Sequence, residues 1–511
     1  MIKLLRLLCV IAGLLALPLT EAHADTQDVA AAARGVVRVI LVATDGDEAY
    51  FVGHGSGVAV APDKILTNAH VVELTREEKS IVIGVIPSEG TKSYGGKVIA
   101  YSPGNDLALI QLEEGSIPTD TFYSGAVQDG QPVTAIGYPG TVDRAQGLDL
   151  QDMIEPLTPV KSSGTVSAGR SSRQFDTILH TAPMASGNSG GPLVDACGRV
   201  VGINSFGSLS DGNDAEFGFA ISNREIASFL RQAGVDFART NVECKSPEQA
   251  QEEEARRTAE ELARQETRER MTADARRAAM TAARDQAEQE IISGRENHMA
   301  VAAILLAFAV LCAGGAALML TQDKRRPAII FGAGGGLLLL GAIVVFFTRP
   351  GFSSIDDRAA LLAPEAAGAA EASYRAAGMN ICHIDETRSR ITVSNINDVP
   401  LKWSATGCVN DRTQFGHSGA RWSRSFVPNS EATIDIRNFE PQTGTYSVDR
   451  YFPGTDTVEA ARKIRERYKV DQCTTDSGAL ADLAAMEADI RAILPARSNE
   501  HLVYHCQKAK P

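Results

Sequence analysis

The first half of the sequence predicts an all-β sandwich or barrel domain. Between about residues 33 and 222 the chain consists of short apolar stretches rich in β-branched residues, which is typical of strands. Gly, Pro, Asn and Asp interrupt these stretches at short intervals, as turns between antiparallel strands require. A helix is expected at the end of the domain, from Asn223 through Gln232. The clearest strand-like runs are residues 36–42, 57–60, 81–85 and 107–110.

Length and composition limit the classes of protein that fit. A chain of 511 residues is too long for one compact core and suggests about three domains. Its 44% hydrophobic and 22% charged residues are ordinary for a globular protein. The formal net charge of −13 argues against nucleic acid as a partner, since phosphate binding requires a basic face. No Cys-x-x-Cys pair or histidine cluster occurs, so neither a metal nor another cofactor is predicted.

The N-terminus has the pattern of a signal peptide over residues 1–24. Lys3 and Arg6 precede an apolar run, and the small-x-small sequence AHA at residues 22–24 offers a cleavage site. The mature chain is then expected to begin near Asp25. An uncleaved anchor helix is the alternative, and in either case the segment that follows is exported.

Cysteine usage agrees with export, because even numbers of cysteines outside the cytosol favour disulfides. Cys197 and Cys244 lie in the first half, and their pairing would tie the β domain to the segment that follows it. The four cysteines of the last third permit three connectivities, which the sequence leaves open. These four are Cys382, Cys408, Cys473 and Cys506.

The chain changes character at Ser246. Ser246, Pro247 and Gln249 form a helix start signal, and residues 246–298 are dominated by Ala, Glu, Arg and Gln. Large apolar residues are few and no heptad repeat is sustained, so a coiled coil is the less favoured interpretation. We expect a solvated helical spacer, which would span on the order of 75 Å.

Two uncharged spans follow at residues 299–320 and 327–348, each long enough to cross a bilayer. The intervening residues 321–326 contain a Lys-Arg-Arg cluster, which should face the cytoplasm. Buried core helices are the alternative. The expected protein is therefore embedded in a bacterial-type inner membrane, with the domains before and after the hairpin on the exported, periplasmic side.

Residues 349–511 are expected to form a linker and a small, disulfide-bearing α+β domain. Strand-like runs occur at residues 390–393, 401–404 and 432–436, and helical patterns at 456–469 and 477–493. The segment has no recognisable catalytic constellation. Its ligand or partner cannot be named from the sequence.

A candidate nucleophile, Ser189, lies in the sequence SGNSGGP at residues 186–192. Glycine tolerates positive φ, so this turn can be tight and can direct the N–H groups of Gly187 and Ser189 at one point as an oxyanion hole. A plain glycine-rich turn is the alternative.

A serine nucleophile also needs a base and a group that holds the base in one tautomer. His70 follows an apolar strand and turn and precedes two valines, and Asp106 opens an apolar strand. His54 and His180 are rival bases, but neither has comparable flanking residues.

These motifs, taken in order, resemble those of the trypsin-like serine proteases, and specifically their HtrA/Deg branch. The matching sequences are TNAHVV at 67–72, DLAL at 106–109, GNSGGP at 187–192, GIN at 202–204 and GFAI at 218–221. The resemblance covers about residues 30 to 235 and implies a protease domain over 25–245 with two packed six-stranded β-barrels. By the same resemblance, His70 is the general base, Asp106 orients it and Ser189 is the nucleophile.

The resemblance also implies a position for the specificity pocket. Pro183, six residues before the serine, would lie at its base, and Asn204, Ser205 and Phe206 would line its wall. None of these residues is acidic, so a preference for Lys or Arg is disfavoured. A small or medium aliphatic side chain is expected before the scissile bond.

The chain departs from the HtrA pattern in lacking a recognisable PDZ module after the protease domain. PDZ-driven activation and cage-like assembly are therefore not carried over, and homo-oligomerisation stays open. The expected function is a membrane-anchored serine endopeptidase acting on exported or misfolded proteins through an acyl-enzyme. The alternatives are a catalytically idle chaperone or scaffold, and a membrane sensor whose C-terminal domain regulates the protease.

Overall fold

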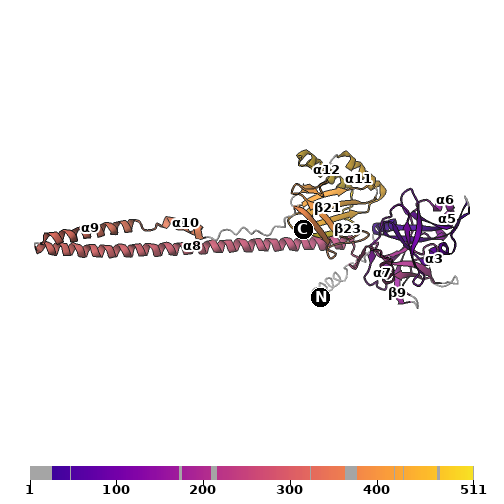
Figure 1. Cartoon of the computed structure of the whole chain (residues 1–511), viewed down its shortest axis with the longest axis horizontal. Coiled ribbons are helices and arrows are strands. Elements are labelled where there is room, and N and C mark those ends of the chain that lie inside the picture. The colour runs from indigo at the N-terminus through magenta and orange to yellow at the C-terminus, as the bar shows by residue number, and fades with distance from the viewer. Residues whose placement is uncertain are drawn as a thin grey trace, which may run out of the picture. The chain divides into compact units, whose positions relative to one another are not determined.

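The computed structural model describes residues 26–45, 48–171, 175–208, 216–322, 324–362, 377–418, 421–429, 431–468 and 472–509. The expected signal peptide, Asp323 of the expected cytoplasmic loop and residues 363–376 of the expected linker lie outside these ranges. The chain divides into two compact units, Met1–Ala255 with Tyr374–Pro511, and Arg256–Ser373. Figure 1 shows the elements of each unit with their labels.

The first unit begins with a closed barrel of six antiparallel strands in the order β1-β2-β3-β6-β5-β4. Its interior is filled by β-branched and leucine side chains, among them the wholly buried Val39, Ile65 and Ile110. Burial of this apolar face is what makes the short runs of the sequence fold as strands. The strands are β1 (Val36–Asp45), β2 (Glu48–Ala61), β3 (Lys64–Thr67), β4 (Ile81–Pro87), β5 (Tyr94–Ser102) and β6 (Leu107–Leu112).

A second barrel follows, with the strand order β11-β8-β9-β10-β13-β12, and pairing of β11 with β12 closes it. Strands β7 and β14 extend this sheet beyond β12. Helix α7 (Asn223–Gln232) packs Ile226, Phe229 and Leu230 into the core, as the sequence predicts. The strands are β7 (Phe122–Tyr123), β8 (Pro132–Gly137), β9 (Val160–Ser171), β10 (Asp176–His180), β11 (Pro192–Val194), β12 (Val200–Gly207), β13 (Gly218–Ser222) and β14 (Arg239–Thr240).

Short helices cover the barrels and their connections. Helix α2 and the 3-10 helix η1 precede β1, and Val29, Ala32 and Ala33 from this segment belong to the core between the barrels' strands. The remaining short helices lie in connections between strands. Their bounds are α2 (Thr26–Ala32), η1 (Ala33–Gly35), α3 (Ala69–Val72), α4 (Leu74–Glu77), α5 (Gly140–Gln146) and α6 (Leu150–Met153).

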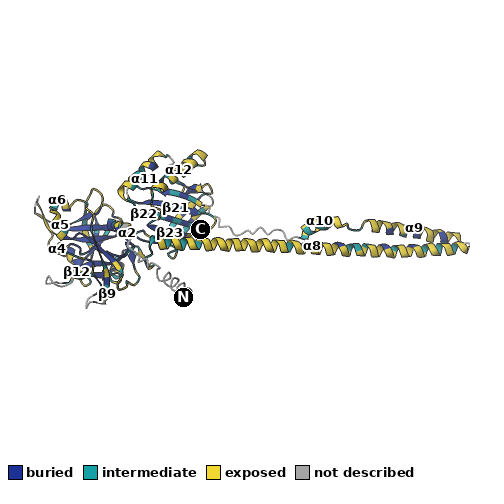
Figure 2. Cartoon of the chain, turned by 180° about the vertical axis from the view of Figure 1, so that it is seen from behind, coloured by how far each residue is buried: buried dark blue, intermediate teal, exposed yellow. Residues whose placement is uncertain are grey.

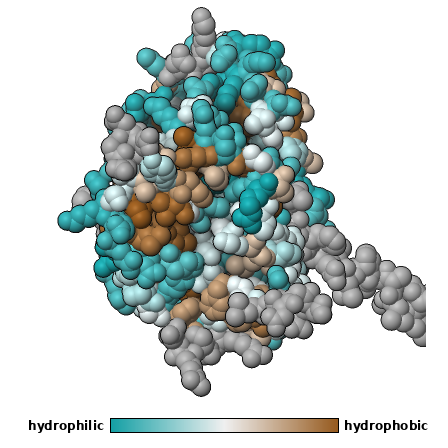
Figure 3. Space-filling model, turned by 90° about the vertical axis from the view of Figure 1, so that its right-hand side faces the viewer, coloured by the Kyte–Doolittle hydropathy of each residue, from teal (hydrophilic) through white to brown (hydrophobic). Residues whose placement is uncertain are grey.

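The prediction of a trypsin-like double β-barrel is thus confirmed, and the four strand-like runs named for the first half, 36–42, 57–60, 81–85 and 107–110, each lie within a strand. Buried residues concentrate inside the barrels (Figure 2). The outer face of the first barrel is partly apolar, because Val42 pairs with Phe51 on one side and with Val82 on the other. Phe51 is 39% exposed and Val82 is 50% exposed. Figure 3 views the molecule from the side of the barrels and shows apolar residues gathered into a patch on that face.

The C-terminal part of the first unit is a sheet of nine strands in the order β18-β17-β16-β15-β23-β22-β21-β20-β19. Two helices, α11 (Thr455–Arg467) and α12 (Ser477–Ile493), pack on it through Ala461, Leu483 and Ile490, so the prediction of an α+β domain is confirmed. The strands are β15 (Gly378–Ile384), β16 (Val399–Trp403), β17 (Cys408–Val409), β18 (Thr413–Gln414), β19 (Gly416–Ser418), β20 (Arg421–Phe426), β21 (Ile434–Glu440), β22 (Thr445–Tyr451) and β23 (Glu500–Lys508).

The described residues form three disulfides. The pairing of Cys197 with Cys244 is confirmed. The connectivity that the sequence left open is Cys382 with Cys506, which are direct partners on β15 and β23, and Cys408 with Cys473. Cys312 is a free cysteine.

The expected strand at residues 390–393 is wrong. Only Arg390 makes an isolated bridge, to His501, and the residues after it form no ladder. The buried carboxylate of Glu500 accepts the backbone N–H of Thr392 at 2.8 Å and that of Ser394 at 2.9 Å. These N–H groups are therefore satisfied by a side chain, which removes the need for a partner strand.

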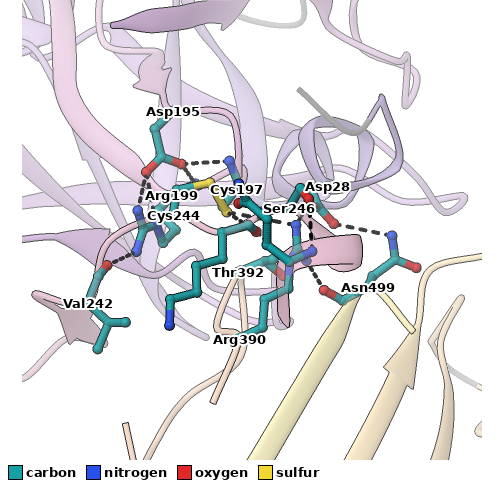
Figure 4. The surroundings of a disulfide bond; sticks show 12 residues. Asp28, Asp195, Cys197, Arg199, Val242, Cys244, Ser246, Arg390, Thr392 and Asn499 are labelled. Atoms are coloured by element: carbon teal, nitrogen blue, oxygen red, sulfur yellow. Dashed lines mark hydrogen bonds and ion pairs between the residues drawn. A yellow bond between two sulfur atoms is a disulfide. The ribbon is translucent and has the colours of Figure 1, made fainter. Parts of the chain in front are cut away.

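This irregular segment joins the C-terminal domain to the second barrel (Figure 4). The guanidinium of Arg390 is 3% exposed and donates to Asp28 at 2.5 Å, and Asp28 itself is wholly buried. Arg390 also donates to the carbonyl of Lys245 at 2.8 Å and lies 3.8 Å from the sulfur of Cys197. The junction thus contains a buried ion pair beside a disulfide, and Asp28 near the N-terminus takes part in it.

Helix α8 (Pro247–Thr321) begins in the first unit and continues into the second. The helix opens with the expected capping box, since Gln249 N donates to Ser246 Oγ and Ser246 N donates to Gln249 Oε1. It continues without a break from the expected spacer into the first expected span. Helix α9 (Arg325–Phe347) is the second span, and the 3-10 helix η2 (Phe352–Ser354) and α10 (Ile355–Leu362) follow.

Both long helices contain an 18-residue window with a mean hydropathy of 2.5 of which 11% is buried, so they are long and apolar enough to cross a membrane. They pack against each other where side chains are small. A Cβ on Gly335 would lie 3.2 Å from the carbonyl oxygen of Ala309 and 3.3 Å from Cys312 Cβ. Close approach without side-chain interference is the usual way in which apolar helices associate in lipid.

Candidate active site

The three candidate catalytic residues come from both barrels. His70 lies on α3 and Asp106 directly precedes β6, so both belong to the first barrel. Ser189 lies in the turn between β10 and β11 of the second. The site therefore lies where the two barrels meet.

The structure brings His70 and Asp106 into direct contact. His70 Nδ1 lies 3.0 Å from Asp106 Oδ1 and 2.9 Å from Oδ2, and the backbone N–H of His70 donates to Oδ1 at 3.1 Å. Since the carboxylate accepts the proton of Nδ1, Nε2 of the neutral ring is left as an acceptor. The side chain of His70 is 47% exposed and that of Asp106 is 17% exposed, so the acid is covered and the base is accessible.

Asp106 is held by contacts from both barrels. Its φ of 51° is in the left-handed region that side chains other than Asn and Asp rarely adopt. Within the first barrel its carbonyl accepts from Asn68 Nδ2 at 2.9 Å and from Ala69 N at 3.2 Å. From the second barrel the hydroxyl of Ser205 donates to Oδ2 at 2.5 Å. These bonds fix the carboxylate in the position that orients His70.

Ser189 Oγ donates to the carbonyl oxygen of Ser205 at 2.8 Å. Within the described ranges it makes no hydrogen bond with His70. The candidate base and the candidate acid are thus in contact, whereas the hydroxyl of Ser189 is turned toward β12. Rotation about the Cα–Cβ bond of Ser189 would release the hydroxyl from this carbonyl, and such rotamer changes are fast.

The serine turn has two backbone N–H groups without an acceptor. Asn188 N donates to Ala185 O at 3.0 Å and Gly190 N donates to Asn204 O at 2.8 Å. For the N–H groups of Gly187 and Ser189, no acceptor is found in the part of the chain that the structure describes. Two free donors on one turn beside the nucleophile are what an oxyanion hole requires.

Glycine is needed in this turn because the backbone passes very close to its neighbours. Gly187 has φ of 102° and Gly190 has φ of 89°. A Cβ on Gly187 would lie 2.2 Å from the carbonyl oxygen of Tyr138, and one on Gly190 would lie 2.1 Å from that of Ser56. A side chain at Gly187 would therefore push the turn away from Tyr138 of the second barrel, and one at Gly190 would push it away from Ser56 of the first.

Ser56, on β2, joins the serine turn to both barrels. Its N–H donates to Ser189 O at 2.8 Å, and its hydroxyl donates to Gly187 O at 2.7 Å while accepting from Tyr138 N at 3.0 Å. Ser56 is wholly buried. Sequence reasoning did not give it a role, although its place between Gly55 and Gly57 is a signal of close backbone approach.

The rival base His54 lies beneath the serine turn and not in the triad. Its Nε2 donates to Tyr138 O at 2.9 Å and lies 3.4 Å from Asp143 Oδ2. Asp143 in turn forms a buried ion pair with Arg38 at 2.9 Å. Burial lowers the pKa of His54, against the opposing influence of the Tyr138 carbonyl and Asp143. His54 therefore helps to hold the serine turn in place through its hydrogen bond to Tyr138.

The other rival, His180, is wholly buried at the end of β10, opposite Gly218 of β13. Burial lowers its pKa to about 4, although the side chain of Asn204 acts in the opposite direction. A ring that cannot reach solvent is unsuited to exchange protons with a substrate. His180 is thus a neutral core residue near neutral pH.

The four residues expected at the specificity pocket have different environments. Asn204 is wholly buried and donates to Pro192 O at 3.0 Å, while the hydroxyl of Ser205 is bound to Asp106. Pro183 is exposed, and Phe206 is 44% exposed and stacks on Phe219 at 4.7 Å between ring centroids. The assignment of the pocket stays a prediction, with Pro183 and Phe206 as its accessible members.

Comparisons with known proteins bear on this site. The family model of the trypsin-like peptidase domain matches residues 55–203, a segment that contains all three candidate catalytic residues. The serine protease Rv3671c of Mycobacterium tuberculosis is 30% identical over 192 residues, which are 35% of this chain and 42% of that protein. The periplasmic serine endoprotease DegP of Escherichia coli is 31% identical over 196 residues, or 37% of each chain.

The magnetosome formation protease MamE of Paramagnetospirillum magneticum is 33% identical over 185 residues, 34% of this chain and 23% of that protein. The chain thus spans less than half the length of these relatives. The active form of the Rv3671c protease aligns with 43% of this chain and 91% of that structure at 23% identity, with a TM-score of 0.33, which is too low to carry an argument. The matches confirm the resemblance to HtrA-type serine proteases and the enzyme class, serine-type endopeptidase, for the peptidase domain.

The contacts of Ser56 predict a loss of turnover when its hydroxyl is removed. In Ser56→Ala, Gly187 O and Tyr138 N lose their buried partner, which costs roughly 1–3 kcal/mol and loosens the oxyanion turn. We expect kcat on a peptide substrate to fall by about 10- to 100-fold, with KM little changed, because the turn acts mainly on the transition state. Ser162→Ala, in the same domain, is the control. An unchanged kcat in a folded Ser56→Ala enzyme contradicts the assignment.

The buried His180 predicts a pH dependence of stability. Its pKa of about 4 lies below the ordinary value of 6.5, so the unfolded chain binds the proton more tightly. The contribution of neutral His180 to the free energy of unfolding is therefore complete above pH 6.5. It is lost as the pH falls toward 4, by about 3 kcal/mol in total. In urea unfolding of the full chain, His180→Leu should lose less stability than wild type over this range, whereas His383→Leu, an exposed control, should follow wild type. Parallel curves for His180→Leu and wild type would refute this.

Proposed function

We propose that this protein is a membrane-anchored serine endopeptidase that cleaves exported or misfolded proteins through an acyl-enzyme. The observation that carries the proposal is the contact of His70 with Asp106, together with the turn of Ser189, in which the N–H groups of Ser189 and Gly187 have no acceptor among the described residues. A base, its orienting acid, a hydroxyl nucleophile and paired N–H donors are the parts that acyl transfer needs.

In the proposed mechanism, the Ser189 hydroxyl rotates to His70 Nε2 and transfers its proton as Oγ attacks the substrate carbonyl. The N–H groups of Gly187 and Ser189 donate to the resulting oxyanion. Protonated His70, stabilised by Asp106, gives the proton to the leaving amine, and an acyl-enzyme remains. Water, activated by His70, then attacks the acyl carbon and releases Ser189.

Several observations support protein substrates on the exported side of a membrane. The relative from Escherichia coli is named a periplasmic endoprotease, and disulfides such as Cys197–Cys244 are typical of exported domains. Helices α8 and α9 are apolar enough to form the anchor, and the Lys-Arg-Arg cluster at residues 324–326, where α9 begins, favours a cytoplasmic position for the connection between them. A small or medium aliphatic side chain before the scissile bond is retained as the proposed preference, and homo-oligomerisation stays open.

The test is covalent labelling of the full chain with a fluorophosphonate, alongside Ser189→Ala, with casein degradation followed in parallel. We expect labelling and degradation by wild type and neither by Ser189→Ala, since an ordinary serine hydroxyl does not react. A correctly folded full chain that neither labels nor degrades casein would favour the idle chaperone or scaffold instead.

A second candidate function is regulation of the peptidase by the C-terminal domain. It is favoured by the junction at Arg390, which lies against the turn between β11 and β12. Strand β11 leads back to the turn of Ser189, and β12 leads to Ser205, the partner of Asp106. Within that β11–β12 turn, Asp195 and Arg199 form a buried ion pair at 2.6 Å, so the turn is rigid. Through this short hairpin, the binding of a ligand to the C-terminal domain would change the positions of the candidate catalytic residues.

Replacing Arg390 tests this coupling, because Arg390→Met removes the buried cation that forms the ion pair with Asp28. We expect kcat/KM to fall by about tenfold or more, and the additional change Asp28→Asn to restore part of the activity. Arg412→Met, an exposed arginine of the same domain, is the matched control. Activity equal to wild type in folded Arg390→Met, together with unchanged activity on deletion of residues 349–511, would contradict regulation through this junction.

A further inference from the structure

The second barrel contains a cavity that the catalytic site does not use. Its volume is about 620 Å³, and it lies between the segment 123–127, strands β9 and β10 and helix α7. None of the triad residues, nor Gly187, borders it. A volume of this size is typical of sites for small molecules or chain ends.

The floor of the cavity is apolar. Val166, Ile178 and Val201 border it and belong to the buried core of the barrel, and all three are less than 9% exposed. Tyr123 and Val127 continue the apolar surface toward the opening. The cavity therefore offers its occupant the burial of apolar groups, which favours binding in proportion to the area removed from water.

One wall of the cavity is a single face of α7. Arg224, Ala227 and Arg231 border the cavity and follow one another at spacings of three and four residues, which places them on the same side of the helix. The two arginines are separated by roughly 10 Å along the helix axis, since each residue adds 1.5 Å. An extended segment of about three residues spans that length.

The charge of the lining is positive. Arg224 is compensated by an ion pair with Asp176 at 2.9 Å, and Asp176 also borders the cavity. For Arg231, no ion pair is found within the described part of the chain. Arg231, which is exposed and borders the cavity, thus has a guanidinium that pairs with no carboxylate of the described residues, and guanidinium groups bind carboxylates by two parallel hydrogen bonds.

A further donor lies at the other end of the same wall. Ser222 precedes α7 as its N-cap residue, yet its side chain makes no capping bond. Its hydroxyl is buried and has no hydrogen-bond partner in the described residues. Buried polar atoms are nearly always satisfied, so an unpartnered hydroxyl in a cavity wall points to a ligand.

From the apolar floor, the uncompensated Arg231 and the free hydroxyl of Ser222, we propose that this cavity binds an apolar chain that ends in a carboxylate. The carboxylate pairs with Arg231 and the apolar chain lies over Val166, Ile178 and Val201. The C-terminal end of an apolar polypeptide and a fatty acid share this chemistry. This binding does not require the chemistry of Ser189.

The experiment uses the full chain as Ser189→Ala, in a lipid nanodisc, so that no peptide is cleaved. The probe is a dansyl-labelled apolar pentapeptide with a free C-terminal carboxylate, compared with its C-terminal amide by fluorescence anisotropy. We expect the acid to bind about tenfold or more tightly than the amide, which corresponds to one charge-assisted pair. Arg231→Gln should remove this difference, and Lys79→Gln, an equal change of charge on the first barrel, should retain it.

Two further measurements complete the test. Ala227→Phe, which fills the cavity from α7, should weaken binding of both acid and amide. Octanoate should compete with the peptide acid if fatty acids are bound, and absence of competition assigns the site to polypeptide ends. Equal binding of acid and amide, no binding of either, or unchanged binding in Arg231→Gln overturns the proposal. Fluorophosphonate labelling of an Arg231→Gln enzyme that retains Ser189 reports separately on the catalytic function.

Discussion

The carboxylate of Asp106 is the point on which the arrangement of the site depends. It accepts from His70 of the first barrel and from Ser205 of the second, so one side chain connects the two barrels at the site. Its backbone adopts a left-handed conformation that is stabilised by Asn68. Strain of this kind persists only where surrounding contacts fix it, and here it aims the carboxylate at the base.

The serine turn is held in place in a different way, by close packing of its backbone, which is possible because glycine has no side chain. Gly187 and Gly190 let the turn approach Tyr138 and Ser56 at distances that no Cβ permits. The hydrogen bonds of Ser56 then hold two carbonyl groups of the turn. Because these carbonyls point toward the first barrel, the free N–H groups of the turn are available to a ligand. Preorganised donors of this kind stabilise developing charge without reorganisation.

The C-terminal domain is joined to the peptidase by buried charge, which distinguishes it from a domain on a flexible tether. Arg390, Asp28 and Glu500 are all inaccessible to solvent, and each is hydrogen-bonded. A buried ion pair adds little net stability but makes the loss of either partner costly, so it specifies one arrangement. The Cys197–Cys244 disulfide lies beside the pair and restrains the same turn.

The sequence by itself determined the all-β class of the first domain, the start of α8 and the order of the motifs that carry His70, Asp106 and Ser189, whereas the double barrel was implied by the resemblance to the trypsin-like proteases. These features are local, since strand patterning, capping boxes and glycine turns are encoded by neighbouring residues. The pairing of Cys197 with Cys244 was predictable because the exported first half offers only these two. By contrast, the run at residues 390–393 has strand propensity, but its backbone donates a hydrogen bond to the buried carboxylate of Glu500. This tertiary contact overrides the local preference.

Only the tertiary structure decided the roles of Ser56, Ser205 and His54. Ser205 was expected at the wall of the specificity pocket, yet its hydroxyl binds Asp106, which is 99 residues away in the sequence. His54 had the chemistry of a base, but folding buries it beneath the serine turn, where burial lowers its pKa. The cavity beside Arg231 likewise combines residues of five strands and a helix. Contacts between distant residues depend on how the barrels close, and no local pattern in the sequence records that.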